Sequence, residues 1–258
     1  MLKESGIIVT GLLAFLSLTG CMHKVPVMVA EYTAAEPDIS MAGKVWKQAP
    51  EYHFLPYTAG TWYEEIERAN GMRDRVLEPG SIKLLWNENF LYIGVKMTDS
   101  DLVDEAERNQ THIFLLADTV ELFIKPGNHP YYWEIYGSVN AKKTCYFYPG
   151  RGRLGLPVND TYKHGVEVET ILNGTLNDDG DHDRGWTLML KIPAAELTRY
   201  GAKWDATEKW TIHLVRHNYS VYLPSREVSA YPEFKAGNPH FYEGYANLIL
   251  DKKTAGRQ

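Results

Sequence analysis

Residues 118–124 read DTVELFI. Apolar side chains at the even-numbered positions alternate with a mixed set at the odd-numbered positions, which is the period of a β-strand with one face toward a core. The odd-numbered face carries Glu121 between Thr119 and Phe123. A carboxylate in this position either points into water or, beside an aromatic ring, binds a polar ligand. The neighbouring segments help to decide between exposure to water and ligand binding.

Eight further segments have strand character and are separated by short runs of turn residues such as Asn, Asp, Gly and Pro. They are residues 81–86, 90–97, 131–139, 143–148, 165–172, 186–192, 210–216 and 245–250. Helical periodicity is limited to residues 62–69 and 194–199. The pattern predicts an all-β fold: a single β-sandwich of antiparallel sheets, immunoglobulin-like or of jelly-roll type, with one or two short helices.

The first 20 residues have the layout of an export signal. Lys3 is followed by the apolar run IIVTGLLAFLSL and by LTGC, which ends at Cys21. The run is too short to span a bilayer, and LTGC resembles a bacterial lipobox, so we expect cleavage before Cys21 and lipidation of its thiol. The alternative is an ordinary secretory signal with an incidental cysteine. The prediction is an exported, membrane-anchored lipoprotein, facing the periplasm or displayed at the cell surface.

The remaining chain divides simply. We predict a tether over residues 21–37, one β-sandwich domain over residues 38–252 and a tail over residues 253–258. Trp46 is expected to anchor the core near the start of the domain, and we expect a monomer. Cys145 is the thiol that remains after Cys21, so neither an intramolecular disulfide nor a cysteine zinc site is expected.

The composition excludes some classes of function. A formal net charge of −6 argues against a nucleic-acid surface. The stretch GRGRLG at 150–155 matches a dinucleotide-loop pattern, but Leu156 and Pro157 oppose the helix that such a loop requires. Seventeen Tyr and seven Trp favour strands and can provide stacking surfaces.

The stretch LNDDGDHDRGW at 176–186 concentrates oxygen ligands. Asn177, Asp179, Asp181 and Asp183 offer side chains of the type that calcium prefers, and crowded carboxylates repel one another unless a cation offsets the repulsion. We therefore predict a calcium site here. The alternative is a solvated acidic hairpin.

The segment YYWEIYGSV at 131–139 places Glu134 and Tyr136 on one strand face. If this strand neighbours residues 119–125, then Glu121, Glu134 and Tyr136 converge on one sheet surface. Paired carboxylates there can accept hydrogen bonds from sugar hydroxyls, or can serve as acid and base in glycoside hydrolysis. The third possibility is a pair of exposed strand residues.

Two other sets of side chains are candidates. Arg216 and Asn218 follow the apolar strand WTIHLV, and the planar guanidinium could neutralise Glu121 or hold a ligand oxygen, although a structural salt bridge explains Arg216 equally well. Met97 and His213 are possible axial ligands of a haem, which β-sandwich domains of the DOMON type bind between their strands.

Six segments, in order, resemble the family 9 carbohydrate-binding modules. They are DISMAGKVWKQAP, IKLLWNENFLYIGVKMTDSDL, DTVELFIKP, YYWEIYGSVNAK, NDDGDHDRGWTLMLKIPAAEL and NPHFYEGYANLIL, which together cover roughly residues 36–250. The resemblance implies a β-sandwich, often with structural calcium, that binds glucose-, cellulose- or xylan-type sugars through aromatic rings and polar side chains.

Carried over position by position, the resemblance makes Glu121 a ligand-binding residue. The family's stacking ring before D-x-V-E falls near Leu115, its second stacking tryptophan near Tyr231 and its basic residue near Tyr136. We therefore expect non-catalytic binding of a glycan, held by Glu and Arg hydrogen bonds and by Tyr or Trp stacking. A glycosidase or an accessory domain of carbohydrate catabolism is the first alternative, and a haem-binding domain the second.

Overall fold

The computed structural model describes residues 25–57, 71, 74–151, 161–233 and 238–252. Cys21 and the helix expected over residues 62–69 lie outside these residues. Within them, no helix is both long and apolar enough to cross a membrane.

Every predicted strand is present to within about two residues at each end, and the all-β class is confirmed. The strands are β1 (Val27–Tyr32), β2 (Tyr52–His53), β3 (Leu55–Pro56), β4 (Gly80–Trp86), β5 (Phe90–Met97), β6 (Thr119–Pro126), β7 (Tyr132–Ser138), β8 (Lys143–Tyr148), β9 (Glu167–Asn173), β10 (Gly185–Pro193), β11 (Trp210–Asn218), β12 (Glu227–Tyr231) and β13 (Ala246–Asp251). The described residues also form the helices α1 (Lys44–Gln48) and α3 (Ala194–Thr198) and the 3₁₀ turns η1 (Ile113–Leu115) and η4 (Tyr242–Gly244). Helix α3 is the one expected at 194–199.

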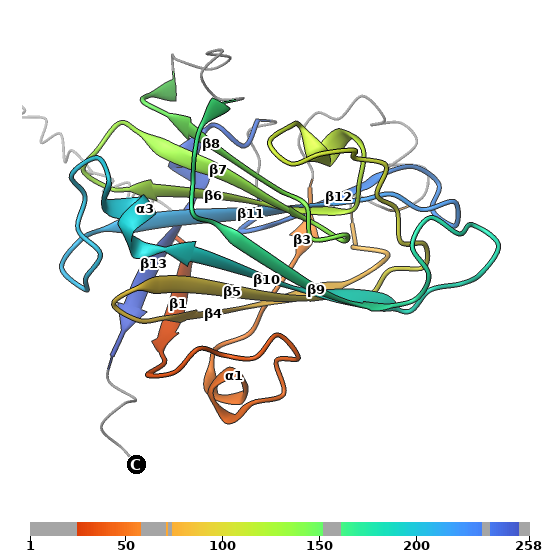
Figure 1. Cartoon of the computed structure of the whole chain (residues 1–258), viewed down its shortest axis with the longest axis horizontal. Helices are drawn as coiled ribbons and strands as arrows, with labels where there is room; N and C mark the ends of the chain where they lie inside the picture. The colour runs from red at the N-terminus through yellow and green to blue at the C-terminus, as the bar shows by residue number, and fades with distance from the viewer. Residues whose placement is uncertain (1–24, 58–70, 72–73, 152–160, 234–237, 253–258) are drawn as a thin grey trace, which may run out of the picture.

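The strands form one continuous hydrogen-bonded path. Its order is β8-β7-β6-β11-β13-β1-β4-β5-β10-β9, with β12 paired to β11 and β3, and β2 paired to β4. The path folds back on itself, so that β7 of the β8-β7-β6-β11 half packs against β10 of the β4-β5-β10-β9 half, and Figure 1 shows the first four strands above β10, β5 and β4. The result is a sandwich-like arrangement in which β13 and β1 join the two halves.

The two halves enclose the main core. Even-numbered side chains of β6, Val120 and Leu122 among them, are fully buried together with Leu188 and Leu190 of β10. Gly137 of β7 marks a close approach of the two halves, because a Cβ atom built there would lie 2.8 Å from both of these leucine side chains. The period-two pattern of residues 118–124 is therefore explained by burial of its apolar face between the layers.

One boundary and one feature of the topology differ from the prediction. Residues 21–37 were expected to be a tether, but β1 begins at Val27 and its Met28 and Ala30 are fully buried. Strand β1 also runs parallel to both β13 and β4, so the sheets are not purely antiparallel. Trp46 of α1 is fully buried, as expected of a core anchor.

The contact between β7 and β10 can be tested at Gly137. We expect Gly137→Val to lower the free energy of unfolding by about 1–3 kcal/mol, because the new methyl groups must displace Leu188 and Leu190 in a packed core. Urea unfolding followed by tryptophan fluorescence measures this change.

The matched control is Gly150→Ala, where the added Cβ meets no atom within 4 Å. It should leave the stability within about 0.5 kcal/mol of the wild type. Equal effects of the two substitutions would contradict the described packing of the layers.

Candidate functional site

Strand β6 is buried on both of its faces. Its even-numbered side chains enter the main core, while Glu121 and Phe123 on the other side are 4% and 0% exposed. We call this second side the outer face and define it by Glu121 and Phe123 of β6, Glu134 and Tyr136 of β7, and His217 of β11. Tyrosines cover much of it, so the polar groups are held in a poorly hydrated environment.

The register of β6 and β7 brings the two carboxyls together. Glu121 lies opposite Tyr136, and Glu134 lies opposite Phe123, so the two glutamates are diagonal neighbours on one face. The Tyr136 hydroxyl donates to Glu134 Oε1. The structure thus assembles Glu121, Glu134 and Tyr136 as expected. The alternative of two exposed strand residues is wrong for Glu121 and Glu134, because each is only 4% exposed.

An imidazole and an aromatic ring complete the inner part of the site. His217 Nε2 lies 2.9 Å from Glu121 Oε2. The ring of Phe114 stacks on Tyr136 with centroids 5.7 Å apart and lies 5.0 Å from the His217 ring. The aromatic position expected at Leu115 is therefore taken by Phe114, and Leu115 itself is 56% exposed.

Asp118 holds the loops that carry this ring. Its fully buried carboxylate accepts hydrogen bonds from the backbone N–H groups of Val103 and Tyr219, both at 2.7 Å. The Tyr219 hydroxyl in turn donates to the carbonyl oxygen of Phe114 at 2.9 Å. The first residue of D-x-V-E therefore positions the site, whereas the glutamate three residues later lies in it.

A second aromatic group borders Glu134. Tyr132 and Tyr148 stack with ring centroids 4.9 Å apart, and the Tyr132 hydroxyl lies 2.8 Å from His240 Nδ1. The other imidazole nitrogen, Nε2, lies 3.9 Å from Glu134 Oε2. Half-buried His240 thus forms part of the rim, together with half-buried Tyr57 and Arg226.

Burial dominates the electrostatics of this face. It raises the pKa of Glu121 to about 7, with the neighbouring side chains of Glu134 and Tyr136 and the charge of Arg226 acting in the other direction. Burial and then repulsion by Glu121 raise the pKa of Glu134 to about 7. Burial and the charge of Arg226 lower the pKa of His217 to about 3, so its imidazole is neutral at physiological pH.

Arg216 and Asn218 do not lie on the outer face. Val215 is opposite Glu121, so the even-numbered side chains of β11 point to the core side. Arg216 is fully buried there and donates to Asp99 Oδ2 at 3.2 Å and to Asn218 Oδ1 at 2.9 Å. The predicted contact of Arg216 with Glu121 is wrong, and the alternative of a structural salt bridge is confirmed for Arg216. Asn218, predicted to bind the ligand, lies beside Arg216 on the core side.

Tyr231 is also on the core side. It lies opposite Leu214 of β11, and its ring packs 5.1 Å from that of Tyr52. Its predicted place as a second stacking ring beside Glu121 is therefore wrong. The side chains that replace it near the site, Arg226 and His240, come from loops or strand ends where no periodicity marks them.

The two residues considered as haem ligands are also separated. Met97 packs in the main core, and a Cβ atom built on Gly80 would lie 3.2 Å from its Cγ atom. His213 is on the other side of β11, with its ring stacked on Tyr245 at 5.4 Å and 8°. The two side chains do not face a common space, so Met97 and His213 cannot be the two axial ligands of one haem.

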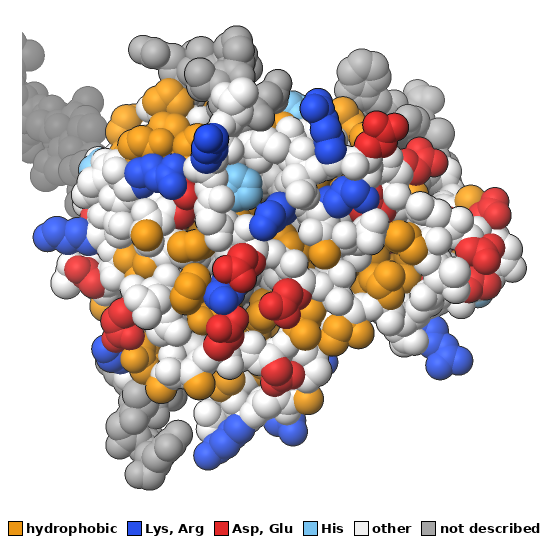
Figure 2. Space-filling model, in the orientation of Figure 1, with side chains coloured by type: hydrophobic (Ala, Val, Ile, Leu, Met, Phe, Trp, Pro, Cys, Tyr) orange, Lys and Arg blue, Asp and Glu red, His pale blue; other side chains and the backbone are white. Residues whose placement is uncertain are grey.

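Two of the predicted calcium ligands in the acidic loop form hydrogen bonds with backbone groups. Asp183 accepts hydrogen bonds from the backbone of Leu102 and Thr175, both at 2.7 Å, and Asn177 exchanges two hydrogen bonds with the backbone of Asp104. Asp179 and Asp181 are exposed, and acidic side chains gather on this end of the molecule (Figure 2). No group of three or more His, Cys, Asp or Glu side chains suited to a metal occurs in the described ranges. The four residues therefore do not fit a common calcium site, and calcium in this protein stays a prediction.

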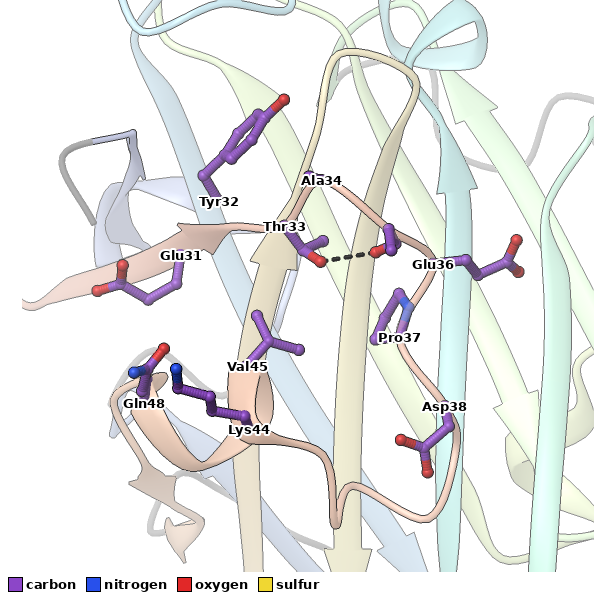
Figure 3. Close-up of a pocket in the computed structure, with 11 residues that line it drawn as sticks. Glu31, Tyr32, Thr33, Ala34, Glu36, Pro37, Asp38, Lys44, Val45 and Gln48 are labelled. Atoms are coloured by element: carbon purple, nitrogen blue, oxygen red, sulfur yellow. Dashed lines mark hydrogen bonds between the residues drawn. The ribbon is translucent and has the colours of Figure 1, made fainter. Parts of the chain in front are cut away.

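A separate hollow of about 510 Å³ lies between β1, the loop that follows it and α1. Glu31, Asp38, Lys44 and Gln48 border it, and a hydrogen bond from Thr33 to a backbone oxygen closes the loop (Figure 3). Its charged groups are dispersed around an open rim, unlike the paired carboxyls of the outer face. We therefore take the outer face as the candidate site.

The first half of the chain matches a known family model. Residues 42–152, which include Glu121, Glu134, Tyr136 and Phe114, match the model described as carbohydrate family 9 binding domain-like. The resemblance to the family 9 carbohydrate-binding modules is confirmed. No curated protein matches the chain.

Solved structures share the fold of most of the chain. A "putative carbohydrate-binding protein" from Bacteroides uniformis superposes with a TM-score of 0.62 at 10% identity, over 88% of this chain and 100% of that one. A family 9 carbohydrate-binding module from Caldicellulosiruptor kristjanssonii, solved with cellotriose, gives a TM-score of 0.57 at 13% identity over 87% and 93% of the two chains. The same module solved with glucose gives a TM-score of 0.56 at 13% identity, over 87% of this chain and 95% of that one.

Because the carboxyls of Glu121 and Glu134 are buried, we expect the free energy of unfolding to fall as the pH rises, and Glu121→Gln should remove part of this fall. The ordinary glutamate pKa is 4.5 and the folded value is about 7, so the stabilisation is complete below pH 4.5 and is lost as the pH rises through 7. The variant should therefore gain about 3 kcal/mol relative to wild type between pH 4.5 and pH 8. Urea unfolding at four pH values across this range measures the difference.

The comparison between the two proteins isolates the carboxyl, because both keep His213 and His217, whose lowered pKa values act in the opposite direction. Glu169→Gln on exposed β9 is the control and should follow wild type at every pH. A constant difference between Glu121→Gln and wild type across the range would contradict the dehydrated carboxyl.

Proposed function

We propose that this protein binds a glycan through the outer face, without catalysis, while anchored to a membrane by a lipid on Cys21. The observation that carries the proposal is the convergence of Glu121, Glu134 and Tyr136 beside Phe114 on one sheet face. Carboxyl and hydroxyl groups next to an aromatic ring match the two kinds of surface that a sugar presents, its hydroxyl edge and its apolar ring face.

The comparisons support carbohydrate as the ligand class. The region that matches the family 9 model contains the carboxyl pair and the Phe114 ring. The module from Caldicellulosiruptor kristjanssonii was solved with cellotriose and with glucose, and it shares the fold. We take a glycan as the ligand on these grounds, with the contacts assigned from the geometry of this chain.

The arrangement of the carboxyls favours binding over hydrolysis. The two carboxyls of a glycosidase are about 5–5.5 Å apart in retaining enzymes and about 6.5–9.5 Å apart in inverting ones, because the scissile bond lies between them. Glu121 and Glu134 are diagonal neighbours on adjacent strands, where His217 Nε2 lies 2.9 Å from the first carboxyl and the Tyr136 hydroxyl donates to the second. Both carboxyls are therefore engaged with neighbouring side chains of the outer face and are not set on either side of an open space for a glycosidic bond.

Calorimetry on the full-length chain, kept in a detergent without a sugar head group, tests the proposal after a glycan array has identified ligands. We expect a Kd of about 10–1000 µM for an oligosaccharide, since such sites bury a limited area. Glu121→Ala and Phe114→Ala should each weaken binding by about tenfold, which corresponds to the loss of one good polar or stacking contact.

Tyr200→Ala is the matched control. It removes a ring that is 40% exposed at the end of α3, away from the outer face, and should leave the affinity unchanged. Absence of any glycan ligand, or wild-type affinity in both site variants, would refute the proposal.

The lipid anchor has a test of its own. When the chain is expressed in a bacterium, it should partition into the detergent phase of a Triton X-114 extraction, and Cys21→Ser should move it to the aqueous phase. Equal partitioning of both proteins would show that Cys21 carries no anchor.

A further inference from the structure

The outer face carries more negative than positive groups. Glu121 and Glu134 are both 4% exposed, and Arg226 is the cation that acts on Glu121. His217 and His240 are the imidazoles that face the pair, and burial favours the neutral form of each. One guanidinium at the rim thus accompanies two buried carboxyls.

Two unused hydrogen-bonding atoms of this face are acceptors, whereas the Nε of Arg226 at the rim is an unused donor. Glu134 Oε2 has no donor within hydrogen-bonding distance, and neither has His217 Nδ1, although the two residues are only 4% and 7% exposed. A neutral imidazole that donates its Nε2–H to Glu121 keeps Nδ1 as an acceptor. A buried acceptor without a donor destabilises the free protein, so the face calls for a ligand rich in donors.

The charge of that ligand follows from the same groups. With a neutral sugar bound, the two carboxyls either become protonated or remain ionised and buried without a compensating positive charge. An acidic sugar adds a third negative charge next to the pair. A protonated amine provides three donors and a positive charge at one point, and so satisfies both the empty acceptors and the carboxyl charge.

We infer that the preferred ligand is a glycan with a free, non-acetylated amino group, whose ammonium binds between Glu121 and Glu134 while its sugar ring packs against Phe114. Tyr57 and Arg226, at the half-buried rim, then face the hydroxyl groups of the same sugar. The inference rests on the proposed carbohydrate binding and narrows it to one chemical class.

Three trisaccharides that differ only at carbon 2 test the inference. They are the β-1,4-linked trimers of glucosamine, of N-acetylglucosamine and of glucose, measured by calorimetry on the full-length wild-type chain at pH 7 and 150 mM salt. We expect the glucosamine trimer to bind at least tenfold more tightly than either of the others. Equal or tighter binding of the glucose or N-acetylglucosamine trimer would overturn the inference.

Controls separate recognition from simple attraction by an acidic protein. Spermidine, an amine without a sugar ring, should bind at least tenfold more weakly than the glucosamine trimer, and equal binding would overturn the inference. Glu134→Gln should reduce the preference for glucosamine over glucose trimer to less than threefold, whereas Glu169→Gln on β9 should keep it. An unchanged preference in Glu134→Gln would also count against the inference.

The outcome also distinguishes this inference from the proposed function. If the wild-type chain binds all three trimers with equal affinity, carbohydrate binding stands and the amino-sugar preference is refuted. Absence of binding by any of the three, together with an empty glycan array, removes both.

Discussion

The packing of β6 and β7 against β10 is the constraint on which the candidate site depends. Once Val120, Leu122 and Gly137 are committed to the space between the layers, Glu121, Glu134 and Tyr136 have to point the other way. Tyrosines and Phe114 then cover that side and exclude water from it. The raised pKa values of the two glutamates are therefore a consequence of how the sandwich-like core is filled.

Strand periodicity was sufficient to predict which side chains of a single strand share a face. It placed Glu134 with Tyr136 correctly, and it located the nine strands with strong alternation. It was not sufficient to relate β11 to β6, because the face of Arg216 depends on a register that pairs Val215 with Glu121. A shift of the register by one residue would have placed Arg216 at the site instead of His217, and only the folded chain determines which register is correct.

Other differences between prediction and structure have related causes. Phe114 lies in the 3₁₀ turn η1, where no two-residue period indicates that it, rather than Leu115, faces the sheet. Strand β1 pairs with segments more than 50 residues and more than 200 residues away, so nothing local distinguishes it from a tether. The acidic loop matched the composition of a cation site, but Asn177 and Asp183 satisfy backbone groups of the neighbouring loop.

The parallel pairing of β1 with β13 also has a mechanical consequence. The preceding chain enters β1 beside Asn247, and the following chain leaves β13 beside Glu31, at the opposite end of the same ladder. A pull that separates the two ends of the domain would load the paired residues of this ladder in shear, so that their hydrogen bonds would have to break together. Such geometry resists tension better than strands that unzip one pair at a time.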